Sequence, residues 1–363
     1  MSMPKIFCSA ALVAIAMIAT SQAADLTAGM KKGTPDLKSA GPATFAPQGI
    51  LLVGDPDSAK IFAIATGDKS AGSPSQPLNI KQIDSKIAGL LGTTPKEILI
   101  NDLAVNPETG STFLTVSRGR GPDANPVIIR VDSSGELDEF SLNGVLFSSA
   151  PIPSAPESDR ARREVTTDLQ FTGGKIIVAG LSNEEFASQL RVLPFPFAKS
   201  DDGTSVEIWH AAHGKFETRS PVRTFAVFDV GGQPNVLAAY TCTPLVRFPL
   251  SDLKPGTKVK GTTIAELGNR NRPLDMIVYD KDGKDYLLMA NSSRGVMKVD
   301  VEKIDETDGV TERVSGGGTA GLPYDTIEDL QGVEQLDKLD KNHALLLVRN
   351  NGGALDLKAV QLP

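Results

Sequence analysis

One pattern recurs along this chain and limits what it can fold into: a short apolar strand, a turn rich in Gly, Pro, Asp or Asn, and a second apolar strand. The clearest copies span residues 101–116, 168–179, 224–239 and 275–289, and weaker copies begin near Phe45 and Leu330. The second strands open at positions 50, 113, 176, 236, 286 and 345, so their mean spacing is 59 residues. Short strands repeated at a long, nearly fixed period are typical of β-propellers.

We therefore predict an all-β fold, a six-bladed β-propeller, with seven blades as the alternative. Blades usually take about 40 to 50 residues, so this longer period requires insertions. Three stretches rich in Gly, Ser or Pro are the candidates: 67–77, 148–163 and 315–323. Near-continuous apolar runs such as Ile176–Ala179 are expected for sheets covered on both faces. Only Ser85–Leu91 suggests a helix, and a short one.

The two ends of the chain are expected to meet in the ring. The last repeat reaches Pro363 with only three strands. We predict that an N-terminal segment within residues 24–40 supplies the missing outer strand and closes the ring. The propeller domain itself then covers residues 41–363.

Residues 1–23 have the pattern of a secretory signal peptide. Lys5 precedes an apolar and small-residue run from Ile6 to Thr20, and Ser21-Gln22-Ala23 places small side chains at the −3 and −1 positions of a cleavage site. The uncharged stretch from Ile6 to Ala24 is 19 residues long, so an uncleaved membrane anchor is the alternative. We predict cleavage, a periplasmic or secreted mature protein, and no membrane insertion after cleavage.

Charge and cysteine content narrow the function classes. With 37 Lys and Arg against 44 Asp and Glu, the chain has a net charge of −7, which argues against nucleic acid as a partner. After signal removal Cys242 is the single cysteine, so no intramolecular disulfide can form. The sequence contains no phosphate-binding loop, dinucleotide fingerprint, nucleophile elbow or His-Glu-x-x-His motif.

Propeller topology gathers distant residues at one end of the central channel. Each innermost strand starts at that end, and the loop between the second and third strands returns to it. The strand starts contribute Asn101, Asp102, Thr167, Asp168, Arg223, Arg272 and Asp275. The loops contribute Asp55, Arg118, Arg120, Asn183, Cys242, Asn291, Arg294, Arg349 and Asn350.

This mixture of Arg, Asn and Asp suits a channel mouth that recognises a small polar or anionic ligand, because the Arg guanidinium binds carboxylates in a bidentate fork. The candidate ligand-binding residues are Asn101, Asp102, Asp168, Arg223, Arg272, Asp275, Asn291, Arg294 and Arg118. The alternative is that these side chains pair with one another and cap the channel.

Three segments carry a family resemblance: residues 41–53 (Gly-Pro-x-x-Phe-x-Pro-x-Gly-Ile-Leu-x-Val), 101–107 (Asn-Asp-Leu-Ala-Val-Asn-Pro) and 272–276 (Arg-Pro-Leu-Asp-Met). In these segments the chain resembles the regucalcin/gluconolactonase-like and NHL-type propellers. The resemblance covers the blade skeleton and implies a ring of blades around a functional channel.

The lactonase family places a divalent cation at the ring centre, held by a Glu, two Asn and an Asp. Here Asn101 fits its position, whereas Ala40, Thr167 and Leu274 stand at the other three. Asp275 is displaced by one residue, which turns a strand side chain to the opposite face. The lactonase chemistry is therefore not carried over.

A cation at the channel nevertheless stays an alternative. Its ligands would be Asn101, Asp102, Asp168 and Asp275, and the cofactor would be Ca²⁺ or Zn²⁺ in a metal-dependent hydrolase or lactonase.

A second possible metal site is the His-x-x-His motif within Trp209–Gly214. The flanking residues alternate like a hairpin of outer strands, so His210 and His213 face opposite sides unless the turn redirects one ring. We expect an exposed turn there, with a zinc site as the alternative. Cys242 is expected to be a small buried side chain and not a nucleophile.

These observations favour an exported, non-enzymatic binding module. Its partner would be a small polar molecule or a periplasmic protein. A metal-dependent hydrolase and a structural subunit of a periplasmic complex are the alternatives, and the sequence names no substrate.

Overall fold

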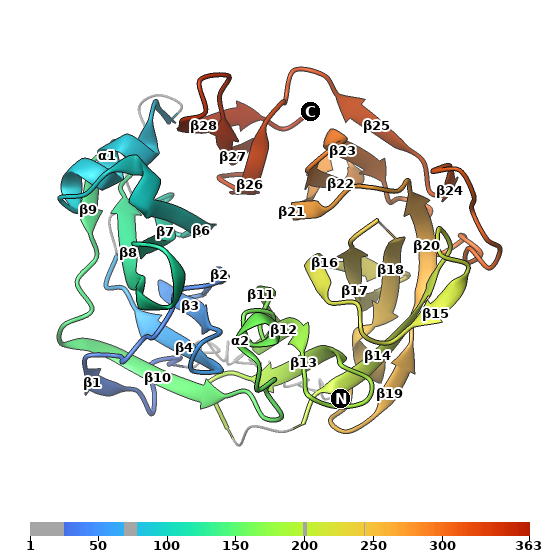
Figure 1. Ribbon diagram of the computed structural model, residues 1–363, viewed down its shortest axis with the longest axis horizontal. Coiled ribbons are helices and arrows are strands. Elements are labelled where there is room, and N and C mark those ends of the chain that lie inside the picture. The colour runs from blue at the N-terminus through green and yellow to red at the C-terminus, as the bar shows by residue number, and fades with distance from the viewer. Residues whose placement is uncertain (1–24, 69–77, 199–201, 243) are drawn as a thin grey trace, which may run out of the picture.

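Six β-sheets surround a central axis like the blades of a propeller (Figure 1). The structure is a computed structural model that describes residues 25–68, 78–198, 202–242 and 244–363. Six sheets around one axis confirm the predicted six-bladed, all-β fold and rule out the seven-bladed alternative. The predicted signal peptide lies outside the described residues. Among those that are described, no helix is long and apolar enough to cross a membrane.

The blades are numbered here by the chain order of their innermost strands, and strands are given from the axis outward. Blade 1 contains β2 (Ala43–Ala46), β3 (Ile50–Asp55), β4 (Lys60–Ala65), β10 (Val145–Pro151) and β1 (Lys31–Gly33). Blade 2 contains β6 (Ile98–Val105), β7 (Thr112–Arg118), β8 (Asn125–Val131) and β9 (Leu137–Glu139). Blade 3 contains β11 (Asp168–Thr172), β12 (Lys175–Leu181), β13 (Ser188–Pro194), β14 (Thr204–His210) and β15 (Lys215–Glu217), with β19 (Lys258–Lys260) beside β14.

The other three blades complete the ring. Blade 4 contains β16 (Val222–Val230), β17 (Gln233–Tyr240), β18 (Pro244–Pro249), β20 (Thr262–Leu267) and β24 (Thr319–Gly321). Blade 5 contains β21 (Pro273–Lys281), β22 (Lys284–Asn291), β23 (Gly295–Asp300) and β25 (Tyr324–Ile327). Blade 6 contains β26 (Val333–Lys338), β27 (His343–Arg349), β28 (Leu355–Gln361) and β5 (Asn79–Ile80). Two short α-helices, α1 (Ile83–Leu90) and α2 (Asp159–Arg162), lie in the connections.

The predicted second strands correspond to β3, β7, β12, β17, β22 and β27, each of which begins within three residues of its expected position. Helix α1 matches the short helix expected at Ser85–Leu91. The stretch 148–163 is more than a loop, because it contains the end of β10 and the whole of α2.

The blades do not follow one another around the ring in chain order. Contacts between innermost strands give the ring order β6, β2, β11, β16, β21 and β26, with β26 against β6 (Figure 1). Strand β10 follows blade 2 in the sequence but pairs with β4 of blade 1, with Leu146 opposite Ala65. Blade 2 is therefore inserted between the third and fourth strands of blade 1.

The last blade in the chain, blade 6, is completed by a strand from an earlier part of the sequence. The prediction that residues 24–40 supply this strand was wrong. Strand β1, which lies within residues 24–40, pairs with β10 and extends blade 1. The outer strand of blade 6 is β5, whose Ile80 lies opposite Leu357 of β28. Because β5 directly precedes blade 2 in the sequence, it reaches the last blade from the neighbouring position in the ring.

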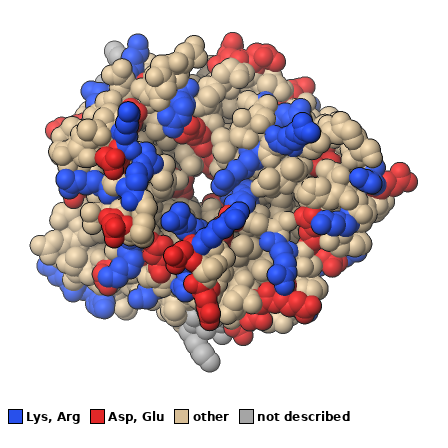
Figure 2. All heavy atoms as spheres, viewed as in Figure 1, with Lys and Arg blue, Asp and Glu red and all other residues tan. Residues whose placement is uncertain are grey.

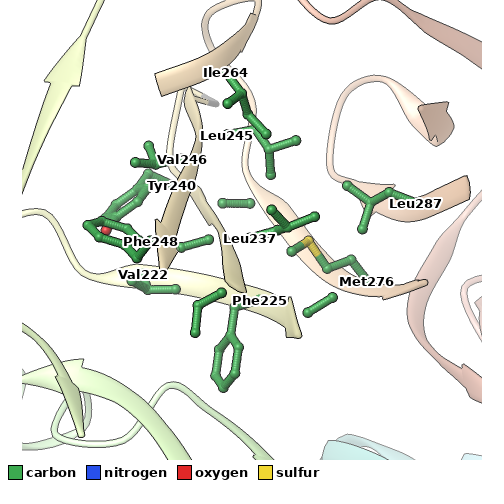
Figure 3. Close-up of a cluster of buried hydrophobic side chains, with 14 of the residues drawn as sticks. Val222, Phe225, Leu237, Tyr240, Leu245, Val246, Phe248, Ile264, Met276 and Leu287 are labelled. Carbon is green, nitrogen blue, oxygen red and sulfur yellow. The ribbon is translucent and has the colours of Figure 1, made fainter. Parts of the chain in front are cut away.

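Apolar side chains between neighbouring blades form the core (Figure 3). Phe225 and Leu237 of blade 4 belong to the same buried cluster as Met276 and Leu287 of blade 5. Full burial of one such side chain contributes about 1.5 to 3 kcal/mol to stability. This packing holds the innermost strands rigidly around the channel.

Candidate functional site at the channel mouth

A cavity of about 1010 Å³ opens at the end of the ring where the innermost strands begin. The seven polar residues predicted at the strand starts all line it: Asn101, Asp102, Thr167, Asp168, Arg223, Arg272 and Asp275. Figure 2 shows the opening at the centre of the ring, with basic side chains around it and acidic ones beside them. These seven residues therefore lie at the channel mouth, as their positions at the strand starts predict.

Bulges at the start of the innermost strands aim some of these side chains. The strand pairing skips one residue at Asn101 in β6, at Arg223 in β16 and at Leu274 in β21. A bulge leaves the extra residue unpaired and bends the strand, which redirects the side chain. All three of these residues line the cavity.

The loop residues mostly lie away from the cavity, and only Arg120 lines it. Asn291 is buried and donates to Asn271 Oδ1 (3.2 Å), while Arg294 donates to the carbonyl of Asn269 (3.4 Å). Arg118 is exposed at the end of β7. These three candidates do not line the mouth, because the second strand of a blade lies behind the innermost one and its loop begins farther from the axis.

The channel carboxyls also join neighbouring blades. Asp102 accepts the backbone N–H of Ala43 in blade 1, Asp168 that of Phe225 in blade 4, and Asp275 that of Leu336 in blade 6, each at 2.8 Å. The other oxygen of each carboxyl accepts the N–H of the residue that follows it in its own strand, at 2.6–2.8 Å. Each Asp is therefore a latch between two blades.

Asp337 is a fourth latch, which was not among the predicted site residues. Its carboxyl accepts the N–H of Val105 in blade 2 (2.8 Å) and of Lys338 (2.7 Å). All four latches reach the next blade in the same direction around the ring. Asp337 is the fifth of the six residues of β26, so the strand-start pattern that indicated the other three Asp residues does not reach it.

Burial raises the pKa of all four latch carboxyls. It raises the pKa of Asp168 to about 7 and that of Asp337 to about 6. Burial, with repulsion from the other channel carboxyls, raises the pKa values of Asp102 and Asp275 well above the usual range. The deep part of the mouth therefore carries less negative charge at neutral pH than its composition suggests.

The outer part of the mouth is rich in arginine. Six arginines line the cavity: Arg120, Arg160, Arg162, Arg163, Arg223 and Arg272. Four acidic residues line it outside the latches: Asp57, Glu157, Asp159 and Glu164. With the latch carboxyls partly neutral, positive charge exceeds negative charge at the mouth.

The arginines differ in whether other residues of the protein already form hydrogen bonds or ion pairs with them. Arg120 donates to the carbonyls of Lys96 and Ile98, and Arg223 pairs with Glu164 at 3.0 Å. Among the described residues, the Arg272 guanidinium has no hydrogen-bond or ion-pair partner. Burial and the positive charge of Arg223 lower the pKa of Arg272. Two guanidinium groups thus lie near one another at the mouth, and one of them is unpaired.

The channel carboxyls do not gather as metal ligands. In the part of the chain that the structure describes, the one group of three His, Cys, Asp or Glu ligand atoms within 4.8 Å of one another is His210, His213 and Glu217, on blade 3. Asn101 uses its amide nitrogen to donate to Ala40 (2.7 Å) and Ser117 (2.9 Å). The geometry at Asn101, Asp102, Asp168 and Asp275 fits inter-blade latches better than a cation cage.

Comparisons with known proteins yield only distant likenesses. No protein-family model matches the chain, and no curated protein matches it. A putative oxidoreductase (glucose dehydrogenase) from Thermus thermophilus is 12% identical, covers 92% of this chain and 100% of its own, and has a TM-score of 0.37. The PQQ-bound aldose sugar dehydrogenase from Streptomyces coelicolor is 12% identical over 91% of this chain and 96% of its own, with a TM-score of 0.35. The plexin A4 extracellular region is 9% identical over 92% of this chain and 40% of its own, with a TM-score of 0.43.

Proposed function

We propose that this protein binds a small organic anion, one with carboxylate or phosphate oxygens, at the mouth of the propeller channel. The observation that carries the proposal is the unpaired guanidinium of Arg272, which lines the cavity together with Arg223 from the adjacent strand β16. Glu164 forms its ion pair with Arg223, which leaves the Arg272 guanidinium available, and Arg binds anionic oxygens in a bidentate fork.

Uncharged polar residues of the cavity suit the hydroxyl groups of such a ligand. Asn101, Thr167 and Gln335 also line the cavity, and their side-chain oxygens can accept hydrogen bonds from ligand hydroxyl groups, whereas their donors already serve carbonyls and Ser117. An anion with hydroxyl groups would match the two arginines together with these uncharged polar side chains.

A metal-dependent hydrolase is less well supported at this site. Both oxygens of Asp102, Asp168 and Asp275 already accept backbone N–H groups. Hydrolysis at the channel would need a cation that these latches do not gather.

We also propose that the protein acts outside the cytoplasm. The support is the signal-peptide pattern of residues 1–23. N-terminal sequencing of the protein recovered from its native host tests this, and a mature chain beginning at Ala24 is expected.

The binding proposal is tested by thermal unfolding with sodium phosphate, citrate and gluconate, with glucose as the uncharged control, all at constant ionic strength. Binding to the folded state raises the melting temperature by mass action. At least one of the anions is expected to stabilise the wild type, with or without EDTA, and glucose is not.

Arg272→Ala and Arg294→Ala form a matched pair for this test. Arg272 lines the cavity and Arg294 does not. Loss of one charged hydrogen-bonding group costs about 1.5 to 3 kcal/mol, so R272A should weaken anion binding by about 10- to 100-fold. R294A should bind like the wild type. Equal binding by R272A, or stabilisation that disappears in EDTA, would contradict the proposal.

A further inference from the structure

The hairpin of β14 and β15 brings two histidines and a glutamate together at the outer rim of blade 3 (Figure 1). His210 is the last residue of β14, and the N–H groups of His213 (3.1 Å) and Gly214 (2.8 Å) both donate to its carbonyl. This tight turn requires Gly214 at φ +65°, and it folds the His213 ring back onto His210 with 3.8 Å between ring centroids. The turn thus redirects one ring, which is the condition for zinc binding that the strand alternation imposed.

Glu217 completes the group and was missed in the sequence analysis. Its Oε2 lies 3.0 Å from His210 Nδ1, and its Oε1 lies 2.7 Å from His213 Nδ1. Ser220 donates to Oε2 at 2.6 Å and so fixes the orientation of the carboxylate. Ser220 and the two imidazole Nδ1 atoms thus surround the two oxygens of the Glu217 carboxyl.

The spacing of these atoms is close to that of a tetrahedral metal centre. The three ligand atoms lie within 4.8 Å of one another. Zinc bonds of about 2.0 to 2.1 Å place tetrahedral ligand atoms about 3.3 Å apart. The Glu217 oxygens lie 3.0 and 2.7 Å from the two Nδ1 atoms, so these separations need to widen by about 0.3 to 0.6 Å. Lys215 Nζ, 3.6 Å from Glu217 Oε1, is on an exposed side chain that can move aside.

Burial favours a defined site with access for a fourth ligand. His210 is 2% exposed and Glu217 is 11% exposed, whereas His213 is 46% exposed. The inner two ligands are therefore fixed by packing, and solvent reaches the site from the side of His213. Three protein ligands and one open position are the pattern of zinc sites that keep a bound water.

The fold itself leaves polar atoms here without partners. Among the described residues, His210 Nε2 and Glu266 Oε1 are both buried and make no hydrogen bond. Glu266 Oε2 accepts the N–H of Ala212 (3.1 Å), which ties this carboxyl to the same turn. Metal binding at Nδ1 moves the imidazole proton to Nε2, and metal-bound histidines commonly donate that proton to a nearby carboxylate or carbonyl.

We propose that His210 Nδ1, His213 Nδ1 and the Glu217 carboxylate bind one Zn²⁺ ion, with water as the fourth ligand. Two imidazoles and one carboxylate are a ligand set typical of zinc, whereas Ca²⁺ and Mg²⁺ prefer all-oxygen sites. The site lies on the outer hairpin and is separate from the anion site proposed at the channel.

The test is a zinc titration of the chelator-treated, dialysed protein by isothermal calorimetry, with Co²⁺ absorption spectra as a second readout. The wild type is expected to bind one equivalent of Zn²⁺ with a dissociation constant in the micromolar range or below. Co²⁺ should give the intense visible bands of a four-coordinate site. No stoichiometric zinc binding by the wild type would overturn the proposal.

His213→Ala and Glu217→Gln are the test variants, and His343→Ala is the matched control. His343 also lies beside a carboxylate, with Nδ1 2.9 Å from Asp340, but has no second histidine. We expect H213A and E217Q to lose at least about tenfold in zinc affinity and the four-coordinate Co²⁺ spectrum, while H343A and R272A keep both. Because His213 is half exposed, H213A should fold normally, and retained zinc binding in H213A would also contradict the proposal.

Discussion

The carboxyl of Asp337 in β26 accepts the backbone N–H of Val105 in β6 at 2.8 Å, across 232 residues of sequence. This hydrogen bond joins blade 6 to blade 2 at the point where the ring closes. Together with the latches of Asp102, Asp168 and Asp275, it gives four of the six blade-to-blade junctions a carboxyl that accepts a backbone N–H from the next blade. Among the described residues, the junctions of blade 1 with blade 3 and of blade 4 with blade 5 have no such Asp.

Removing the Asp337 latch should destabilise the ring. In Asp337→Ala the N–H groups of Val105 and Lys338 lose their acceptor. Val105 is buried, and leaving a buried donor unpaired costs about 1 to 3 kcal/mol. Asp337→Asn keeps one acceptor oxygen and should cost less. Urea unfolding measures both, with the exposed Asp329→Ala as the control. A D337A protein as stable as D329A would show that the latch does not hold the ring.

The latch carboxyls also predict how stability depends on pH. Burial raises the pKa of Asp168 to about 7 and that of Asp337 to about 6 in the folded protein, against about 3.9 in an unfolded chain. Between these values the folded state binds more protons than the unfolded state, so the free energy of unfolding falls as pH rises. The melting temperature should therefore be higher at pH 5 than at pH 8, with most of the loss complete above pH 7.

The variant Asp168→Asn identifies the source of that pH dependence. An amide does not titrate, so this protein should lose less stability between pH 5 and pH 8 than the wild type does. An unchanged pH profile in D168N would assign the dependence to other groups, such as Glu266, whose pKa burial also raises to about 7.

The sequence predicts the blades well because their signal is local. The second strands are buried on both faces, so each appears as an apolar run whose position the structure reproduces. The order of the blades depends instead on long-range pairing, such as Leu146 of β10 with Ala65 of β4. The repeat period is the same whichever neighbour a blade has, so it carries no information on the insertion of blade 2.

The candidate site can likewise be predicted from the sequence only in part: the residues at the strand starts are predictable, and those in the loops are not. The start of each innermost strand follows from propeller topology, which is why Asn101 and Arg272 were placed at the mouth. Loop positions such as Asn291 depend on how far from the axis the loop runs, which strand periodicity does not reveal. Glu217 was missed because its partnership with two histidines depends on a turn that folds one ring back onto the other.

Ring closure by β5 can be tested at Ile80. This side chain is buried opposite Leu357 in the strand pair that completes blade 6. Truncation of a buried Ile leaves a cavity and typically costs about 2 to 5 kcal/mol, so Ile80→Ala should unfold at clearly lower denaturant concentration. Leu90→Ala, at an exposed position ten residues away, should change stability by less than about 0.5 kcal/mol. Equal stabilities of the two variants would show that β5 does not close the ring.

Anion binding at the mouth should become stronger when Arg223 is released from Glu164. The two side chains form an ion pair at 3.0 Å, and a bound anion competes with this carboxylate for the guanidinium. Partly exposed ion pairs are worth up to about 1 kcal/mol, so Glu164→Gln should tighten binding by about two- to fivefold. Calorimetric titration with whichever of phosphate, citrate or gluconate stabilises the wild type measures the change. Weaker binding in E164Q would mean that Glu164 holds Arg223 in its binding position and does not compete with the anion.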